Sequence, residues 1–180
     1  MPPTPAKRRA VPENALKAKW RLTAAWGAAA LALDLVTKAA AGRFLSPYEA
    51  LPVVNDFFNL VLAYNTGAAF SFLAGEGNPG QGLKMTALAL LALLPFLYFF
   101  IQAAPDHRSR LAALGLILGG ALGNIHDRLR WGAVVDFLDF HWRGHHWPAF
   151  NLADLAICLG AGLLGLCFWL EKPDRPEGCG

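Results

Sequence analysis

The chain has 180 residues, of which 55% are hydrophobic and only 16% are charged, and its net charge is +3. Soluble domains contain about 25% charged residues, so this composition argues against an ordinary soluble domain and favours one membrane-embedded domain. Nucleic-acid binding is excluded as well, because the basic residues do not form a docking face interleaved with stacking aromatic residues.

The N-terminal segment, residues 1–20, contains PPTP and predicts a disordered cytoplasmic tail. Six of the sixteen basic residues precede the first apolar run, namely Lys7, Arg8, Arg9, Lys17, Lys19 and Arg21. Such a cluster is typical of the cytoplasmic flank of a membrane helix. The apolar run contains Asp34 and Lys38 and lacks a small-residue cleavage site, so a cleaved signal peptide is not expected.

Four apolar stretches have the length of membrane-spanning helices, at residues 22–41, 85–104, 111–127 and 152–170. A helix of about 20 residues rises about 1.5 Å per residue and so crosses a hydrocarbon core of about 30 Å. The third stretch contains a GxxxG spacing at Gly115 and Gly119, which is typical of closely packed membrane helices. We therefore expect one transmembrane domain over residues 21–172, followed by a cytoplasmic tail at 173–180.

The basic residues also predict the orientation of these helices, because cytoplasmic loops are enriched in Lys and Arg. The tail and the 105–110 connection are basic, whereas the long 42–82 connection contains only Arg43. We therefore expect both termini in the cytoplasm, with the 42–82 and 128–151 connections on the outer side. Three arginines in the second of these connections are an exception to the rule: Arg128, Arg130 and Arg143.

The 42–82 connection contains LPVVNDFFNLVLAYNTGAAFSF, whose β-branched and aromatic residues predict short strands on the membrane surface. GEGNPGQG follows and predicts a flexible turn. Together these features predict an all-α membrane protein with four transmembrane helices. A small extracytoplasmic β-rich subdomain is expected in the first outside connection.

Carboxylates are costly near hydrocarbon, so each aspartate near an apolar stretch needs an explanation. Asp34 and Lys38 are four residues apart on one helical face and are expected to form a structural ion pair. Sixteen residues separate Asp154 from Glu171, a rise of about 24 Å, which places Asp154 at or just inside the outer boundary. We expect Asp154 to be the third residue of a helix that Asn151 caps.

Three further aspartates lie close to the second outside connection. Asp127 is near the C-terminal end of its helix, where the helix dipole is unfavourable, and we expect the adjacent Arg128 to compensate it. Asp136 lies in the apolar, extended segment AVVDF, where an isolated carboxylate is hard to explain structurally. Asp139 ends that segment and is expected to be solvated.

Three histidines, His141, His145 and His146, lie close to Asp139 and raise the alternative of a zinc site. No cysteine ligand and no HExxH helix supports that alternative. Histidines beside tryptophans at a membrane boundary are more typical of an aromatic belt at the level of the lipid headgroups. No metal or other cofactor is therefore expected.

Three separated motifs stand out: NTGAAFS (65–71), GNIHDRLRWGAVVDF (123–137) and PAFNLAD (148–154). They resemble the signature blocks of the lipoprotein signal peptidases, also called the signal peptidase II family. Their order, the four-span layout and the two outside connections match too, so the resemblance covers nearly the whole chain beyond the N-terminal tail. The departures are slight: Leu155 follows the second aspartate where a small or hydroxylated residue is common, and the tail is longer than usual.

The resemblance implies an aspartic intramembrane peptidase of the bacterial inner membrane. Such an enzyme removes signal peptides from prolipoproteins on the amino side of a cysteine that carries diacylglycerol. It implies that Asp136 and Asp154 are the catalytic pair, and Asp34 and Lys38 match the first span of the family. Residues expected to bind substrate or support the pair are Asn65, Gly67, Asn124, Asp127, Arg128 and Asn151. The expected partners are prolipoproteins and membrane lipids, and the chain is expected to be monomeric.

Two carboxyl groups hydrolyse a peptide when they lie close together and share a proton. One ionised oxygen activates water while the other carboxyl donates to the scissile carbonyl, and the helix N-terminus favours the ionised role for Asp154. An alternative is an ion path through a small transporter, along Asp34, Asp127, Asp136 and Asp154. The clustering of these aspartates toward one face and the absence of a clear internal repeat disfavour transport. A second alternative, a non-catalytic scaffold, leaves Asp136 unexplained.

Overall fold

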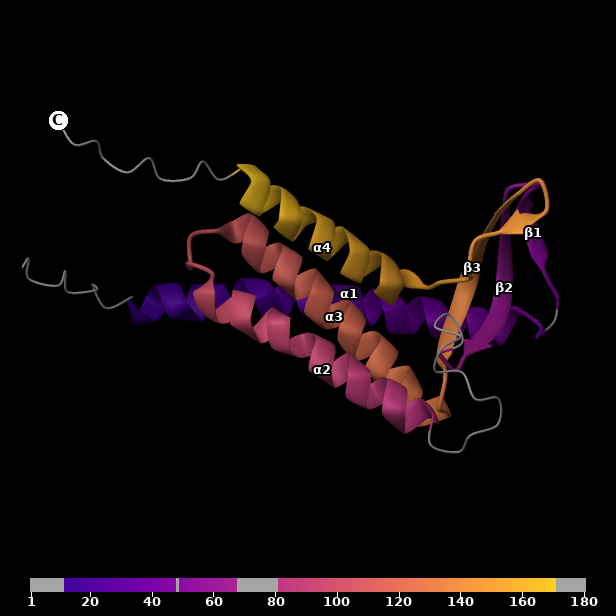
Figure 1. Ribbon diagram of the computed structural model, residues 1–180, viewed down its shortest axis with the longest axis horizontal. Coiled ribbons are helices and arrows are strands. Elements are labelled where there is room, and N and C mark those ends of the chain that lie inside the picture. Colours follow the sequence, from indigo (N-terminus) through magenta and orange to yellow (C-terminus); the bar gives the residue numbers. More distant parts are fainter. Residues whose placement is uncertain (1–11, 48, 68–80, 171–180) are drawn as a thin grey trace, which may run out of the picture.

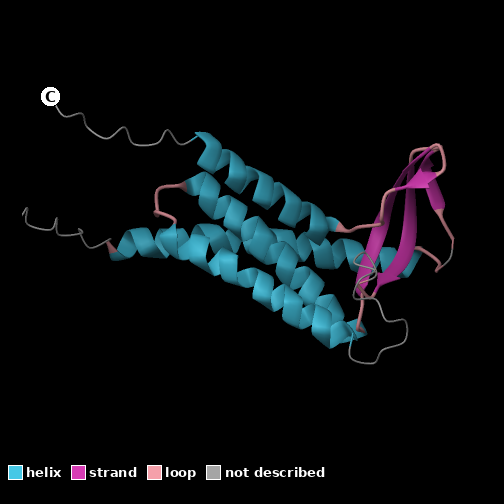
Figure 2. Cartoon of the chain, in the orientation of Figure 1, coloured by secondary structure: helices cyan, strands magenta, loops and turns pink. Residues whose placement is uncertain are grey.

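The computed structural model describes residues 12–47, 49–67 and 81–170. This part of the chain contains four helices that lie side by side, with a small antiparallel sheet across one end (Figure 1, Figure 2). The helices are α1 (Glu13–Phe44), α2 (Gln81–Gln102), α3 (Arg108–Trp131) and α4 (Leu152–Leu170). Each overlaps one of the four predicted apolar stretches, and α4 matches its prediction at both ends.

The central helix is α3, because it packs against all three of the others. Those three have the length and apolar composition needed to cross a membrane, over Glu13–Phe44, Lys84–Gln102 and Leu152–Leu170. α3 is less apolar because protein covers much of its surface, and its buried residues include several glycines together with the polar Asn124 and Asp127. The described residues therefore contain three candidate membrane helices packed around a fourth, more polar one.

Small residues set the distance between α3 and its neighbours. A Cβ atom added at Gly115 would lie 2.6 Å from the carbonyl oxygen of Thr23, and one added at Gly119 would overlap the carbonyl oxygen of Gly27. A Cβ atom at Gly120 would likewise overlap the backbone of Ala153 in α4. The GxxxG spacing thus serves close packing, as predicted, and both interfaces depend on backbones that lie in contact.

The N-terminal helix begins at Glu13, so the expected disordered tail over residues 1–20 is wrong for its second part. Two contacts explain the helical structure there. Lys17 forms an ion pair with Glu13 at 2.7 Å, one turn earlier. Lys19 is buried and donates a hydrogen bond of 2.8 Å to the carbonyl oxygen of Ala103, just beyond the end of α2. Lys19, one of the basic residues before the apolar run, therefore also fastens α1 to the bundle.

The sheet has the strand order β1-β2-β3-β4, and all of its pairs are antiparallel. Its strands are β1 (Leu51–Val54), β2 (Phe58–Asn65), β3 (Val134–Trp142) and β4 (His145–His146). The strands predicted in the 42–82 connection are present, but a sheet confined to that connection is incorrect, because β3 and β4 come from the 128–151 connection. A hairpin of two strands is marginally stable alone, and β3 gives β2 its second neighbour.

Some predictions fall on residues that the structure does not describe. They are the first eleven residues of the N-terminal tail, residues 75–80 of the predicted flexible turn and the cytoplasmic tail at 173–180. The last two residues of that turn, Gln81 and Gly82, are helical instead, because α2 begins there. Part of the first motif, Ala68–Ser71, is also outside the described residues. These predictions are therefore neither confirmed nor contradicted by the described residues.

The close contact between α1 and α3 predicts the effect of Gly119→Ala. The added Cβ would overlap the carbonyl oxygen of Gly27 and push the two helices apart, which should lower the free energy of unfolding by about 1–3 kcal/mol. The matched control is Gly162→Ala in α4, where an added Cβ meets no atom within 4 Å and the better helix propensity should stabilise by up to about 1 kcal/mol. Thermal unfolding of both variants in one detergent measures the difference, and equal changes would contradict the prediction.

Candidate active site

The structure brings Asp136 and Asp154 together through one residue, Asn151. Asp136 lies near the start of β3, and Asp154 lies in the first turn of α4. The side-chain amide of Asn151 donates to Asp136 at 2.7 Å, while its backbone N–H donates to Asp154 Oδ2 at 3.3 Å. The Asn151 Oδ1 atom accepts in return from the backbone N–H of Asp154 at 3.0 Å. This reciprocal pair is the helix cap predicted from the sequence.

Each of the two carboxyl groups accepts a second amide hydrogen bond. Asn65, at the end of β2, donates to Asp136 Oδ2 at 3.0 Å, and Asn124 of α3 donates to Asp154 Oδ1 at 2.8 Å. The register of the sheet explains the first contact, because β2 and β3 pair antiparallel across these residues. The second contact depends on the packing of α3 against α4. Four elements of the fold thus converge on the pair.

Lys38 lies at the centre of a buried cluster behind the two aspartates. Its ammonium group lies 2.8 Å from Asp34 Oδ2 and 2.9 Å from Asp127 Oδ2, and it donates to Asn124 Oδ1 at 3.1 Å. The ion pair expected from the four-residue spacing is present, but it has a second carboxylate. Lys38 therefore pairs directly with Asp127, whereas the adjacent Arg128 acts on it only through electrostatics without an ion pair, because consecutive residues of a helix do not face each other.

The two carboxylates beside Lys38 also bind backbone groups next to the candidate pair. Asp34 Oδ1 accepts from the N–H of Ala153 at 2.9 Å, one residue before Asp154. Asp127 Oδ2 accepts from the N–H of Val135 at 3.1 Å, one residue before Asp136. Sequence reasoning missed both contacts, because a backbone donor carries no signal in the side-chain pattern. They fix the chain immediately ahead of each aspartate.

The environments of the two aspartates differ. Asp136 has an exposed fraction of 2%, and its burial is the main reason why its pKa is raised to about 6. The negative charge of Asp154 raises this pKa further, whereas the amide hydrogen bonds from Asn65 and Asn151 act in the opposite direction. Asp154 is half-buried and lies at a helix N-terminus. Burial therefore favours the protonated form of Asp136 more than in a free aspartic acid.

Arg128 and Gly67 complete the set of predicted site residues. Arg128 is half-buried and donates to the carbonyl oxygen of Asn124 at 3.3 Å, while its Nε atom is buried without a hydrogen-bond partner among the described residues. Gly67 follows β2 with φ +104°, a conformation that favours glycine. Its N–H donates to Asn65 Oδ1 at 2.8 Å. This turn orients the amide that contacts Asp136.

Asp139 is buried, which contradicts the expectation that it is solvated. It accepts hydrogen bonds from Asn59 at 3.0 Å and from His146 Nδ1 at 2.9 Å. Burial by itself would raise its pKa, but these two donors and the nearby histidines hold the pKa below its usual range. The zinc alternative gains no support here, because the described residues contain no group of three or more His, Cys, Asp or Glu side chains placed to hold a metal ion.

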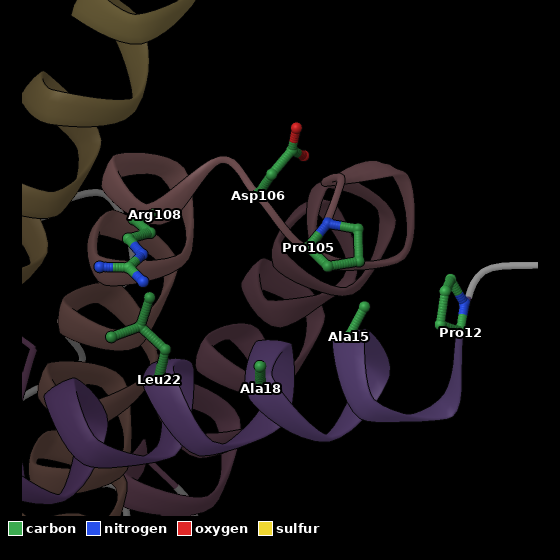
Figure 3. Close-up of a pocket in the computed structure, with 7 residues that line it drawn as sticks. All are labelled: Pro12, Ala15, Ala18, Leu22, Pro105, Asp106 and Arg108. Atoms are coloured by element: carbon green, nitrogen blue, oxygen red, sulfur yellow. The ribbon is translucent and has the colours of Figure 1, made fainter.

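A cavity of about 720 Å³ lies at the opposite end of the helices from the sheet (Figure 3). The residues that line it come from the start of α1 and from the α2–α3 connection: Pro12, Ala15, Ala18, Leu22, Pro105, Asp106 and Arg108. No member of the Asn151-bridged pair or of the Lys38 cluster lines it. The arrangement of carboxyl groups, rather than cavity size, therefore identifies the candidate site.

Comparisons with known proteins identify the family of this chain. The family model described as signal peptidase (SPase) II matches residues 27–170. The lipoprotein signal peptidase of Syntrophotalea carbinolica is 47% identical over 142 residues, covering 78% of this chain and 86% of the relative. The lipoprotein signal peptidase of Ralstonia nicotianae is 53% identical over 132 residues, covering 73% of this chain and 75% of the relative.

Two solved structures are similar in fold. One is described as a bacterial membrane enzyme structure by the in meso method at 1.9 Å resolution. It is 26% identical to this chain, with a TM-score of 0.66, and the match covers 88% of this chain and 94% of the other. The second has the same title at 2.3 Å resolution and is also 26% identical. Its TM-score is 0.67, covering 93% of this chain and 94% of the other. The helices and the sheet thus have counterparts in a known membrane enzyme fold.

Proposed function

The chain belongs to the signal peptidase II family and removes signal peptides from prolipoproteins, and on this premise we propose that Asp136 and Asp154 are its catalytic pair. The observation that carries the proposal is the double contact of Asn151, which donates to both carboxyl groups. This bridge holds two groups from different segments near each other, as a proton-sharing pair requires. Membership of a peptidase family leaves the ion-path and scaffold alternatives without support.

In the proposed mechanism, the ionised Asp154 takes a proton from a water molecule whose oxygen attacks the scissile carbonyl carbon. The protonated Asp136 donates its proton to the carbonyl oxygen, which gives a neutral tetrahedral intermediate. When the C–N bond breaks, Asp154 returns its proton to the leaving amine and Asp136 recovers one from the intermediate. The raised pKa of Asp136 and the amide donors around Asp154 support this assignment.

The remaining residues of the site support the pair or bind substrate. We assign Arg128 to charge stabilisation and substrate binding, since its cation lies among Asp127, Asp136 and Asp154 and its buried Nε–H has no described partner. Asn65 and Gly67 lie where β2 ends beside Asp136, so the backbone of an extended substrate would run past them. Asp34 and Lys38 act structurally.

The proposed topology has four spans, with α3 as the fourth, over one domain at residues 21–172. The start of α1 and the end of α4 lie at the end opposite the sheet (Figure 1), and the basic N-terminal residues favour the cytoplasm for that end. The sheet and the catalytic pair then lie at the outer face of the bacterial inner membrane. We expect the protein to be a monomer, because the pair is complete within one chain.

The proposed substrate carries diacylglycerol on the cysteine that follows the cleavage site. Asp154 lies in the first turn of α4, which has 19 residues, so the pair lies close to one boundary of a hydrocarbon core of about 30 Å. Two acyl chains would hold the cysteine at that depth, since each buried methylene contributes about 0.8 kcal/mol. Lipidation of the cysteine would thus position the scissile peptide bond beside the carboxyl groups of Asp136 and Asp154.

The first test of the function replaces each catalytic carboxyl group. Asp136→Asn and Asp154→Asn should each lower kcat for cleavage of a diacylglyceryl precursor by about 10²–10⁴-fold. The reason is that an asparagine amide can act neither as a general acid nor as a general base in this reaction. The Asp139→Asn variant, altered three residues further along β3, should cleave the precursor at close to the wild-type rate. Melting temperatures show whether each variant is folded, and near-normal turnover in a folded Asp136 or Asp154 variant would refute the pair.

A second test uses pH. The alkaline limb of kcat/KM should fall near pH 6, where Asp136 loses its proton. Asn65 donates to the carboxylate and so favours its ionised form; Asn65→Ala should therefore raise this pKa and move the limb to higher pH. Asn59→Ala is the matched control, because Asn59 makes the same kind of contact from the same strand to Asp139. If the alkaline limb of kcat/KM moved to lower pH, or moved equally in both variants, the result would be inconsistent with Asp136 as the general acid.

The third test addresses lipidation. A precursor with an unmodified cysteine should be cleaved at least about tenfold more slowly than its diacylglyceryl form, because it loses the burial energy of the acyl chains. Both precursors should have the same sequence and be assayed with one enzyme preparation in one detergent. Equal values of kcat/KM would show that the enzyme does not read the lipid, while leaving the catalytic pair intact.

A further inference from the structure

A second cavity, of about 560 Å³, lies between the C-terminal ends of α1 and α3 and the sheet. We propose that it binds the headgroup of an anionic glycerophospholipid. Its polar and aromatic lining consists of Lys38, Arg43, Tyr64, His126, Asp127, Arg130 and Trp131. It shares Lys38 and Asp127 with the buried cluster but contains neither carboxyl group of the catalytic pair. The site is therefore adjacent to the catalytic centre and separate from it.

The charges in this cavity favour an anion. Arg43 and Arg130 are exposed, and neither forms an ion pair with an acidic side chain in the described part of the chain. Their guanidinium groups instead lie over aromatic rings, Arg130 at 4.7 Å from the ring centre of Trp131. Lys38 is already neutralised by two carboxylates. The two arginines thus offer their hydrogen-bond donors to a phosphate, which a guanidinium binds in a bidentate manner.

The polarity of the two helices along the cavity favours a lipid over a free anion. α1 and α3 run in the same direction, since Gly27 packs on Gly119 and Lys38 contacts Asp127 further along both helices. Residues four apart share one face. Going from the sheet toward the opposite end of the bundle, one row of side chains on α1 is Arg43, Ala39 and Leu35. The corresponding row on α3 is Arg130, His126 and Leu122. Both rows change from cationic to apolar, which matches a phosphate headgroup above an acyl chain.

The position of these arginines also requires an explanation under the proposed topology. Arg43 and Arg130 would lie at the outer face, where the orientation rule disfavours basic residues. Exposed Trp131 and Tyr64 beside them mark the depth of the lipid headgroups. An anionic lipid of the outer leaflet would satisfy both cations at that depth. The bound headgroup would also bridge the ends of the two helices that hold Lys38 in place.

The test measures thermal unfolding of the full-length protein in a neutral detergent during titration with dioleoyl phosphatidylglycerol or dioleoyl phosphatidylcholine. Phosphatidylglycerol should raise the melting temperature of the wild type more than phosphatidylcholine does. In R43Q/R130Q the concentration for half-maximal stabilisation should rise by about tenfold or more, since each basic residue near a membrane surface contributes to anionic lipid binding. R21Q/R143Q removes the same charge from two exposed arginines outside the cavity and should respond as the wild type does.

Two results would overturn the proposal: an unchanged response in R43Q/R130Q, or an equal loss in R21Q/R143Q, which would indicate attraction by overall charge. Inorganic phosphate and glycerophosphoglycerol, tested at the same concentrations, separate the headgroup from the complete lipid. Neither should stabilise the protein, and stabilisation equal to that of the lipid would show a free-anion site instead. Because no readout involves cleavage, failure here leaves the proposed catalytic pair untouched.

Discussion

The contacts of one buried ammonium group, that of Lys38, determine how the proposed catalytic centre is built. Lys38 contacts Asp34, Asp127 and Asn124, all of which are buried. Each of these three then holds a different part of the centre: Asp34 binds the start of α4, Asp127 binds the start of β3, and Asn124 donates to Asp154. A buried cation without partners is very unfavourable. The same requirement that neutralises Lys38 therefore positions the two segments that carry Asp136 and Asp154.

The balance of charge in this region favours retention of a proton by the proposed pair. Four carboxyl groups, those of Asp34, Asp127, Asp136 and Asp154, share two cations, those of Lys38 and Arg128. Full ionisation would leave an excess of negative charge where water is scarce. Asp136 is the more enclosed member of the proposed pair, and its burial raises its pKa to about 6, which favours its protonated form. The pair thus becomes asymmetric because of burial, although the two side chains are chemically identical.

Local spacing predicted two contacts of this centre from the sequence, while the resemblance supplied the candidate pair itself. The four-residue interval between Asp34 and Lys38 and the three-residue interval between Asn151 and Asp154 each indicate one contact within a single helix or its cap. Contacts between distant segments could not be read in the same way. The pairing of Asp127 with Lys38, the burial of Asp139 against Asn59 and the addition of β3 to the sheet all depend on which elements become neighbours.

The helix packing connects these polar contacts to the apolar bundle. A lysine on α1 reaches an asparagine on α3 only if the two backbones approach closely, and glycines on both helices allow that approach. Gly123 extends the same logic one step further, because a Cβ atom there would overlap Asp34 Oδ2, the oxygen that faces Lys38. A methyl group at this position would therefore compete directly with the ion pair. Gly123 thus contributes to the proposed catalytic centre, since the space that it leaves is occupied by the carboxylate that holds the start of α4.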